Sequence, residues 1–326
     1  MAIAPRELSF SAPSLRHPEQ FHRTTVYEWG DTDNPDILVC VHGLTRNGRD
    51  FDFLAERLSD TYRILSPDIV GRGKSERLQD PMDYTYPQYM ADLLVMLQAL
   101  DVPACNWVGT SMGGILGMMI ATFHPDKIQR LILNDIGAVV AKQGLDRIAS
   151  YAGITMDFPD RQTAEEALRR IFTPFGVNGD AQWAHLFEYT LKQNAQGGFS
   201  FTYDPDITAP FKAETKNYQE VKAVELWPLW KGIHCPVLVI RGAESDILLR
   251  ETVEEMRKLH PQTTVTEIAG VGHAPTLFEP EQIDIIQNWF KATSPANTTA
   301  KIRPMLLKLR YIILLLAGKL LRKLGQ

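Results

Sequence analysis

Short apolar runs rich in β-branched residues alternate along the chain with segments whose apolar positions recur at helical spacing. The first run, I-L-V-C-V at 37–41, is apolar at every position, so it predicts a strand buried on both faces of a sheet. Strands that alternate with helices are typical of βαβ units and a mostly parallel sheet. The runs predict six strands, at 37–41, 62–67, 104–108, 128–133, 236–240 and 263–268.

Three segments between these runs predict helices that flank the sheet. Apolar residues repeat at helical spacing over 51–58 and over 86–100, which predicts helices with one buried face. The segment 112–123 is almost wholly apolar and therefore predicts a central helix. The fold class that follows is α/β, with a mostly parallel central sheet flanked by helices.

A long segment interrupts this pattern between the fourth and fifth predicted strands. Residues 137–233 spread aromatic side chains among turn residues and short amphipathic stretches. Because an insertion of this length exceeds ordinary loops, we expect a mainly helical cap subdomain. The core then consists of 1–136 and 234–291, followed by a linker at 292–300 and a basic, apolar helix at 301–326.

Composition and charge narrow the class of protein. Hydrophobic residues make up 44% of the chain and charged residues 22%, which is ordinary for a globular protein. Residues 301–326 hold seven of the 34 Lys and Arg and no acid, so 27 basic residues face 39 acidic ones in residues 1–300, a net charge of −12. Such an acidic body argues against nucleic acid as a partner. The three cysteines show no metal-ligand spacing and cannot all pair, which disfavours a zinc site and a disulfide framework.

The two ends of the chain bear on location. The first residues lack a basic stretch followed by an apolar one, so we expect no signal peptide and a cytoplasmic setting. Residues 305–324 contain fourteen apolar and five basic residues in an imperfectly amphipathic pattern. This pattern predicts peripheral membrane contact at the inner face of a membrane, with a membrane span and docking on protein as alternatives.

The candidate chemistry begins with G-x-S-x-G, formed by Gly109, Ser111 and Gly113. The motif lies where an apolar strand meets an apolar helix, which is the setting of a nucleophile elbow. In that turn the serine is exposed at the carboxyl edge of the sheet. The alternative is an N-cap serine at the start of the following helix.

A serine nucleophile needs a base, and the base needs a carboxylate that orients it. Asp246 comes just after the 236–240 run and His273 just after the 263–268 run, so both are expected at the same sheet edge as Ser111. The backbone N–H groups of Leu44, in the loop after the first strand, and of Met112 predict an oxyanion hole.

These motifs closely resemble the α/β-hydrolase superfamily, specifically capped bacterial serine esterases, over about residues 20–291. The resemblance rests on H-G-L-T at 42–45, D-I-V-G-R-G-K-S at 68–75, G-T-S-M-G-G at 109–114, G-A-E-S-D at 242–246 and G-V-G-H-A-P at 270–275. It implies that Ser111 is the nucleophile, His273 the general base and acid, and Asp246 the residue that orients His273. It also implies Leu44 and Met112 as oxyanion donors. Some relatives take the acid from the position of Asp135, which ends the preceding strand, and we expect Asp246 rather than Asp135.

A serine at the elbow disfavours epoxide hydrolases and haloalkane dehalogenases, which attack with a carboxylate on this fold. We therefore expect hydrolysis of a carboxylic ester through an acyl-enzyme, without a cofactor or metal. A lactone, a thioester or the carbon–carbon bond of a diketone acid are alternatives, and arginines 147, 161, 169 and 170 are candidates for holding a substrate carboxylate. The aromatic residues of the insertion predict a partly apolar small-molecule substrate. A low-turnover ligand sensor is the alternative from another class, and the oligomeric state is not specified by the sequence.

Overall fold

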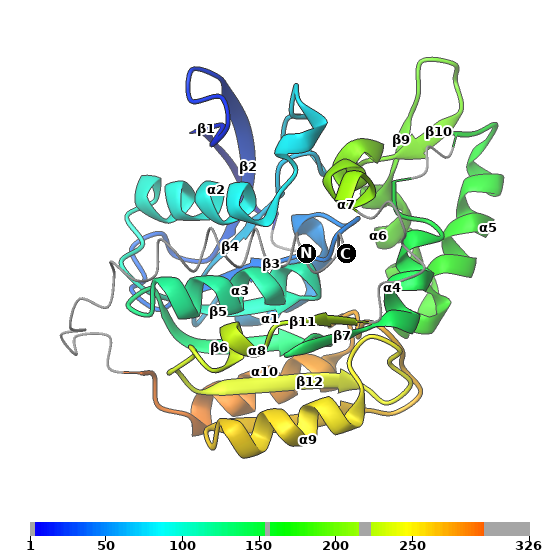
Figure 1. Cartoon of the computed structure of the whole chain (residues 1–326). Coiled ribbons are helices and arrows are strands. Elements are labelled where there is room, and N and C mark those ends of the chain that lie inside the picture. The colour runs from blue at the N-terminus through cyan, green and yellow to red at the C-terminus, as the bar shows by residue number, and fades with distance from the viewer. Residues whose placement is uncertain (1–3, 154–156, 215–222, 297–326) are drawn as a thin grey trace.

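The computed structural model describes residues 4–153, 157–214 and 223–296 (Figure 1). Their main element is an eight-stranded sheet with the strand order β1-β2-β4-β3-β5-β6-β12-β13. Its strands are β1 (Arg6–Pro13), β2 (Phe21–Trp29), β3 (Ile37–Val41), β4 (Arg63–Pro67), β5 (Cys105–Thr110), β6 (Ile128–Asn134), β12 (Val237–Gly242) and β13 (Thr263–Ile268). The strands from β4 to β13 pair in parallel. The predicted α/β class with a mostly parallel sheet is therefore confirmed.

The six predicted strands correspond to β3, β4, β5, β6, β12 and β13. The sequence did not predict β1 and β2. These two strands pair antiparallel with each other, and β2 also pairs antiparallel with β4. Ala12 is the one buried residue of β1, so this edge strand has no apolar run that would mark it.

Alternate residues of the strands face two separate apolar cores. In β3, Val39 and Val41 belong to one core, whereas Leu38 and Cys40 belong to the other. The first core also receives side chains from α2 (Tyr86–Ala99), α3 (Met112–Phe123) and α9 (Arg250–Leu259), and the second from α1 (Asp52–Leu58) and α10 (Pro280–Ala292). The sheet is thus covered on both faces, which is why β3 tolerates no polar residue.

The helix boundaries follow local signals. The Thr85 side chain accepts a hydrogen bond from the Gln88 N–H at 3.3 Å and caps α2, and Pro87 occupies its first turn. Both features are typical of a helix start. The predicted helix 51–58 is divided into the short 3₁₀ turn η1 (Gly48–Phe51) and α1, whereas α3 has its predicted bounds.

The segment between β6 and β12, which was predicted as a cap, folds into short helices and strands. Its elements are β7 (Val139–Ala141), α4 (Lys142–Ala149), β8 (Asp157–Phe158), α5 (Arg161–Phe172), η3 (Thr173–Phe175), α6 (Gly179–Thr190), β9 (Leu191–Gln193), β10 (Phe199–Phe201), η4 (Pro205–Thr208), α7 (Ala209–Glu214), β11 (Ala223–Glu225) and α8 (Trp227–Trp230). The strands form two small sheets, β8-β10-β9 and β11-β7. Figure 1 shows α4, α5 and α6 grouped at the end of the main sheet toward which the arrow of β12 points. These three helices of the insertion therefore lie at the carboxyl ends of the parallel strands.

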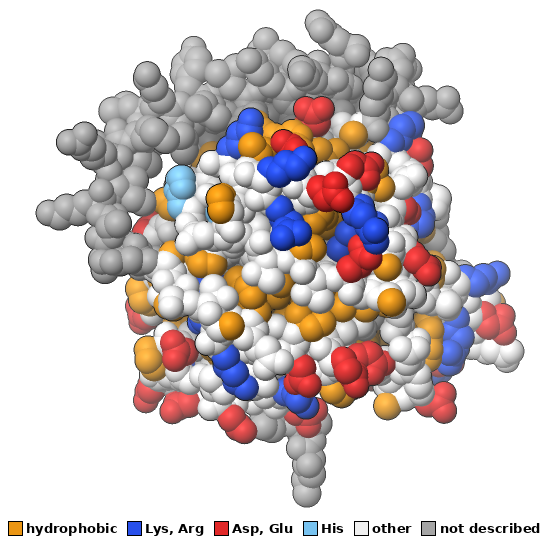
Figure 2. All heavy atoms as spheres, turned by 90° about the horizontal axis from the view of Figure 1, so that it is seen from below, with side chains coloured by type: hydrophobic (Ala, Val, Ile, Leu, Met, Phe, Trp, Pro, Cys, Tyr) orange, Lys and Arg blue, Asp and Glu red, His pale blue; other side chains and the backbone are white. Residues whose placement is uncertain are grey.

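The predicted linker at 292–300 begins on the last residue of α10 and is described only to residue 296. The predicted helix at 301–326, including the proposed membrane contact through 305–324, lies outside the described residues. Among the helices that are described, none has the length and apolar character that crossing a membrane requires. On the face in Figure 2, acidic and basic side chains of the described residues are interspersed rather than gathered by sign.

Candidate active site

Ser111 lies at a sharp turn between β5 and α3. Its backbone has φ 51° and ψ −111°, a left-handed conformation that residues other than glycine rarely adopt. The turn closes only because small residues flank it: a Cβ on Gly109 would lie 2.3 Å from the Gly113 carbonyl oxygen, and a Cβ on Gly113 would lie 1.9 Å from that of Val41. The Ser111 side chain makes no capping bond to the described helix. The local geometry is thus that of an elbow rather than an N-cap.

We expect Gly113→Ala to lower the free energy of unfolding by about 3 kcal/mol or more, because the backbone of Val41 cannot rotate out of the way as a side chain could. Urea unfolding followed by circular dichroism measures the change. Gly43→Ala is the matched control, since a Cβ there would meet its nearest neighbours at 3.8 Å, an ordinary contact, and should cost less than about 1 kcal/mol. Equal stability of the two variants would contradict the tight packing of the elbow.

His273, in the loop after β13, is hydrogen-bonded through both ring nitrogens. Its Nε2 lies 2.9 Å from Ser111 Oγ, and its Nδ1 lies 2.7 Å from Asp135 Oδ2. The His273 side chain is 4% exposed and that of Asp135 is fully buried. A carboxylate accepts hydrogen bonds, so the Nδ1 proton points to Asp135 and Nε2 is free to accept the Ser111 hydroxyl proton. This arrangement suits a general base beside a nucleophile.

The acid at the His273 ring is Asp135, so the geometry contradicts the expectation that Asp246 would occupy that place. Asp135 directly follows β6, and its carboxylate accepts two further hydrogen bonds. They come from the Gly242 N–H at 2.8 Å and from the Ser245 hydroxyl at 2.5 Å. Both donors belong to the end of β12 and the loop after it. That loop therefore holds Asp135 in place instead of supplying the acid itself.

Asp246 is paired with the insertion. Arg147 of α4 donates from Nε to Asp246 Oδ2 at 2.6 Å and from Nη2 to Oδ1 at 2.9 Å. Burial acts to raise the pKa of Asp246, but the hydrogen bonds and charge of Arg147 outweigh it and hold that pKa below its usual value. The turn explains the choice of acid, because Ser245 Oγ also accepts from the Ile247 and Leu248 N–H groups. Ser245 is thereby fixed on Asp135, and Asp246 is left to Arg147.

A residue that the sequence analysis missed connects the two loops of the site. Asn134, at the end of β6, donates from Nδ2 to Thr110 Oγ1 at 3.0 Å and to the Pro275 carbonyl at 2.8 Å. Its backbone carbonyl accepts the Ser111 N–H at 3.0 Å. Asn134 thus links the neighbours of Ser111 to the loop of His273. The signal was present, because two polar residues, N-D, end the apolar strand L-I-L.

The predicted oxyanion donors come from the helix that follows Ser111 and from the loop after β3. Met112 is the first residue of α3, and the N–H groups of a first helical turn have no acceptor within the helix. Leu44 lines the same cavity as Ser111, and its carbonyl is held by Arg72 Nε at 2.9 Å. Because Arg72 is fully buried, this hydrogen bond fixes the peptide group between Leu44 and Thr45.

His42 has a structural place beneath this loop. Its Nδ1 donates to the Gly43 carbonyl at 2.7 Å, and its Nε2 accepts the Ile69 N–H at 3.0 Å. Burial lowers the pKa of His42 to about 3, so the ring is neutral near pH 7. Both nitrogens are occupied, and His42 is not available as a second base.

A mostly apolar cavity lies over Ser111 and His273. Its volume is about 60 Å³. Its apolar lining comes from the core and the insertion and includes Leu44, Phe51, Ile148, Phe172, Phe175, Leu186 and Phe278. Arg46 and Asp50 are charged residues of the lining, whereas the four insertion arginines considered above do not line it.

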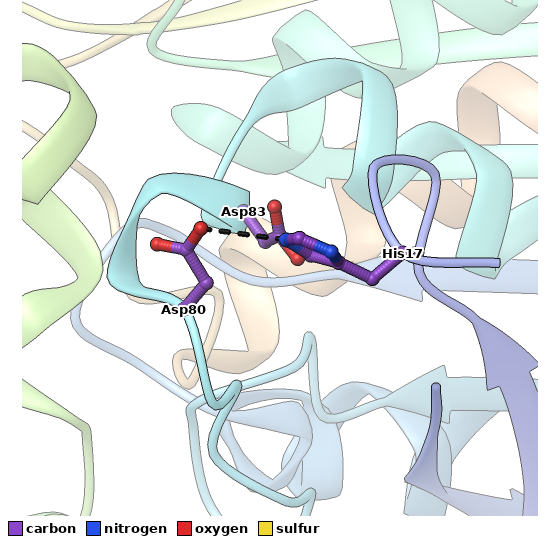
Figure 3. A group of neighbouring side chains, drawn as sticks. All are labelled: His17, Asp80 and Asp83. Atoms are coloured by element: carbon purple, nitrogen blue, oxygen red, sulfur yellow. Dashed lines mark ion pairs between the residues drawn. The ribbon is translucent and has the colours of Figure 1, made fainter. Parts of the chain in front are cut away.

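A separate cluster of potential metal ligands is accounted for by protein contacts. Figure 3 shows His17 beside Asp80, which precedes the 3₁₀ turn η2 (Pro81–Asp83), and beside Asp83, its last residue. Arg16 Nη1 pairs with Asp80 at 2.8 Å and with Asp83 at 3.0 Å, and Asp83 also accepts from the Ser14 hydroxyl at 2.8 Å. These bonds tie the β1–β2 connection to η2, and they give the cluster a structural explanation.

Comparisons with known proteins agree with this architecture. A family model described as alpha/beta hydrolase fold matches residues 36–280. The 3-hydroxybutyrate-oligomer hydrolase of Cupriavidus necator is 41% identical over 276 residues, which cover 84% of this chain and 94% of that protein. A solved structure from Rickettsia typhi, assigned as a hydrolase, is 35% identical with a TM-score of 0.81 and covers 90% of this chain and 100% of its own. An alpha/beta hydrolase from Novosphingobium aromaticivorans is 33% identical with a TM-score of 0.77, covering 89% and 99%.

Proposed function

The chain belongs to the α/β-hydrolase fold family, and we propose that it is a serine hydrolase that cleaves a carboxylic ester through an acyl-enzyme. The observation that carries the proposal is the His273 ring, which is bonded to Ser111 Oγ on one side and to Asp135 on the other. This order of hydroxyl, imidazole and carboxylate is the one that activates a serine.

The proposed reaction begins when Ser111 Oγ attacks the ester carbonyl and His273 Nε2 takes the hydroxyl proton. The N–H groups of Leu44 and Met112 stabilise the resulting oxyanion, and each such donor typically contributes about 3 kcal/mol. The intermediate collapses, and the leaving alkoxide takes the proton from His273. Water then attacks the acyl group in the same way, and the acid is released. In sum, one ester and one water give one acid and one alcohol.

Asp135 acts on His273 rather than on the substrate. Its carboxylate fixes the ring with the proton on Nδ1 and stabilises the imidazolium that forms when Ser111 attacks. The bonds from Gly242 and Ser245 keep it in this position. Because Asp135 is completely buried, its carboxylate is shielded from bulk water.

The proposed substrates are short esters of hydroxy acids. This class is supported by the similarity to the 3-hydroxybutyrate-oligomer hydrolase of Cupriavidus necator, whose name denotes ester bonds between hydroxyacyl units. A small cavity with an apolar lining suits the short aliphatic groups of such esters.

A fluorophosphonate should label the peptide that contains Ser111, because only a serine with an adjacent base is sufficiently nucleophilic. Mass spectrometry identifies the adduct. Ser245 is an internal control, since its hydroxyl is bonded to Asp135 and should remain unlabelled. Turnover of a 3-hydroxybutyrate dimer is then compared with that of a lactone, a thioester and a diketone acid. Absence of the adduct would contradict the serine mechanism, and labelling with negligible turnover of every substrate would favour a sensor.

A further inference from the structure

We propose that the cavity beside Ser111 contains a subsite for a carboxylate, with Arg46 as its cation, so that the preferred ester carries a free acid group. This inference rests on the proposed function and adds a substrate property to it. The insertion arginines, which the sequence suggested for such a role, are not part of the cavity lining. Arg46, two residues after Leu44, does belong to the cavity lining.

Arg46 is buried and held in one orientation. Its side chain is 9% exposed, and its Cζ lies 4.8 Å from the centre of the Phe172 ring in α5. Nε donates to both carboxylate oxygens of Asp50, at 3.1 and 3.0 Å, and Nη2 also pairs with Asp50. Nη1 donates to Thr190 Oγ1 at 2.5 Å. The guanidinium is therefore fixed by the core on one edge and by the insertion on the other.

These contacts leave donors for a ligand. A guanidinium has five N–H groups, and the hydrogen bonds among the described residues engage one on Nε, one on Nη2 and one on Nη1. One N–H on each terminal nitrogen is left over. Two donors on neighbouring nitrogens match the two oxygens of a carboxylate.

The free donors belong to a side chain that adjoins the nucleophile. A Cβ built on Gly43 would lie 3.8 Å from Arg46 Cγ and 3.8 Å from Ser111 Cβ. Both side chains therefore come close to the same backbone position, Gly43, and both line the same cavity. A substrate in this cavity can contact Arg46 with one end and present its carbonyl to Ser111. In an ester between two hydroxy acids, the carboxylate of the leaving alcohol is the group that can take the Arg46 end.

Asp50 lines the same cavity and balances the charge of Arg46, so a carboxylate is held here by the remaining N–H donors of Arg46 and not by an excess of positive charge. Most of the lining is apolar, and burying a carboxylate there is costly without a charge-assisted hydrogen bond. Arg46 can supply that bond without moving, because Asp50 and Thr190 already hold it in place. A neutral ester of the same shape would leave these donors unpaired, so the subsite distinguishes a substrate with a free carboxylate from its neutral ester.

The test compares the 3-hydroxybutyrate dimer with its methyl ester, in which the free carboxylate is blocked. In the full-length chain, we expect Arg46→Gln to lower the ratio of kcat/KM for the acid to kcat/KM for the neutral ester by about 50-fold, the usual effect of losing a charged hydrogen bond. The ratio cancels any damage that affects both substrates equally. Arg49→Gln is the matched control: Arg49 is also paired with an aspartate, Asp52, and its Cζ lies 4.0 Å over the Tyr189 ring of the insertion, but it does not line the cavity. It should leave the ratio unchanged.

A measurement on the unmodified protein covers the case in which Arg46→Gln does not fold. Butyrate and butyramide have nearly the same shape and differ in charge, so butyrate should slow fluorophosphonate labelling of Ser111 at a concentration about 10-fold lower. Equal protection by the two, or an acid-to-neutral ratio that Arg46→Gln does not change, would overturn the carboxylate subsite and leave the serine mechanism intact. Failure of the wild-type chain to hydrolyse either ester would overturn the proposed ester hydrolysis and the subsite with it.

Discussion

Ser111→Ala is expected to lower kcat for p-nitrophenyl butyrate by about five to six orders of magnitude. The variant removes the only atom that can form the acyl-enzyme and leaves His273 facing a methyl group. What remains is the contribution of the oxyanion donors and of substrate binding. Both still assist direct attack by water on the ester carbonyl, in place of attack by Ser111. Release of p-nitrophenolate under conditions of substrate excess measures the change directly.

The loss must be separated from unfolding. Ser111 makes no capping bond to α3, and alanine adopts its backbone conformation at a similar cost, so the thermal midpoint of Ser111→Ala should stay within a few degrees of that of the wild type. Ser150→Ala is the matched control, because Ser150 is an exposed serine of the insertion whose hydroxyl, among the described residues, bonds to the Arg147 carbonyl alone. It should retain full turnover. Near-normal turnover of Ser111→Ala would refute the assignment of the nucleophile.

Much of the fold follows from the sequence, because each parallel strand is buried on both faces and therefore appears as an apolar run. In β3 all five residues are buried, and the run could hardly be missed. The same reasoning fails for β1, where most residues reach solvent at the sheet edge. Pairing of β1 depends on its partner strand β2, and a local pattern does not contain that information.

The identity of the acid could not be settled by the same reasoning. Asp135 and Asp246 follow two strands, β6 and β12, that pair in parallel, with Asn134 opposite Ile240. Both acids are thus delivered to the same edge of the sheet. The choice depends on the Ser245 turn and on Arg147, which is 99 positions away from Asp246 along the chain. Ser111 and His273 were predictable because their motifs contain the local geometry, whereas the acid depends on contacts distant in sequence.

Arg46 illustrates the same limit for the substrate subsite. In the sequence it stands in a loop, T-R-N-G-R-D, whose charges look like those of any exposed turn. Its burial results from Thr190 and Phe172, two residues of the insertion. Arg49 also packs on the insertion, at Tyr189, so what distinguishes Arg46 is that its place in the packed structure lines the cavity.

Asp135→Asn is expected to lower kcat by about four orders of magnitude, whereas Asp246→Asn should retain activity within about tenfold. An amide at position 135 can donate to Nδ1, which places the ring proton on Nε2 and leaves no acceptor for the Ser111 proton. It also removes the charge that stabilises the imidazolium. Asp246→Asn breaks the ion pair between Asp246 and Arg147. The side chains are 28% and 33% exposed, respectively, and partly exposed ion pairs contribute little to stability.

The two variants are matched, since each replaces one carboxylate oxygen with an amide nitrogen at the same edge of the sheet. Their pH profiles distinguish a catalytic effect from a structural one. Loss of Asp135 should make the remaining activity rise with pH, because hydroxide then replaces the missing base, while Asp246→Asn should keep the wild-type shape. The opposite ranking, with Asp246→Asn the more impaired, would mean that the loop after β12 turns during catalysis to present Asp246 to His273. In that case the Arg147–Asp246 pair would have to break in each cycle, and Arg147→Gln would raise activity instead of leaving it unchanged.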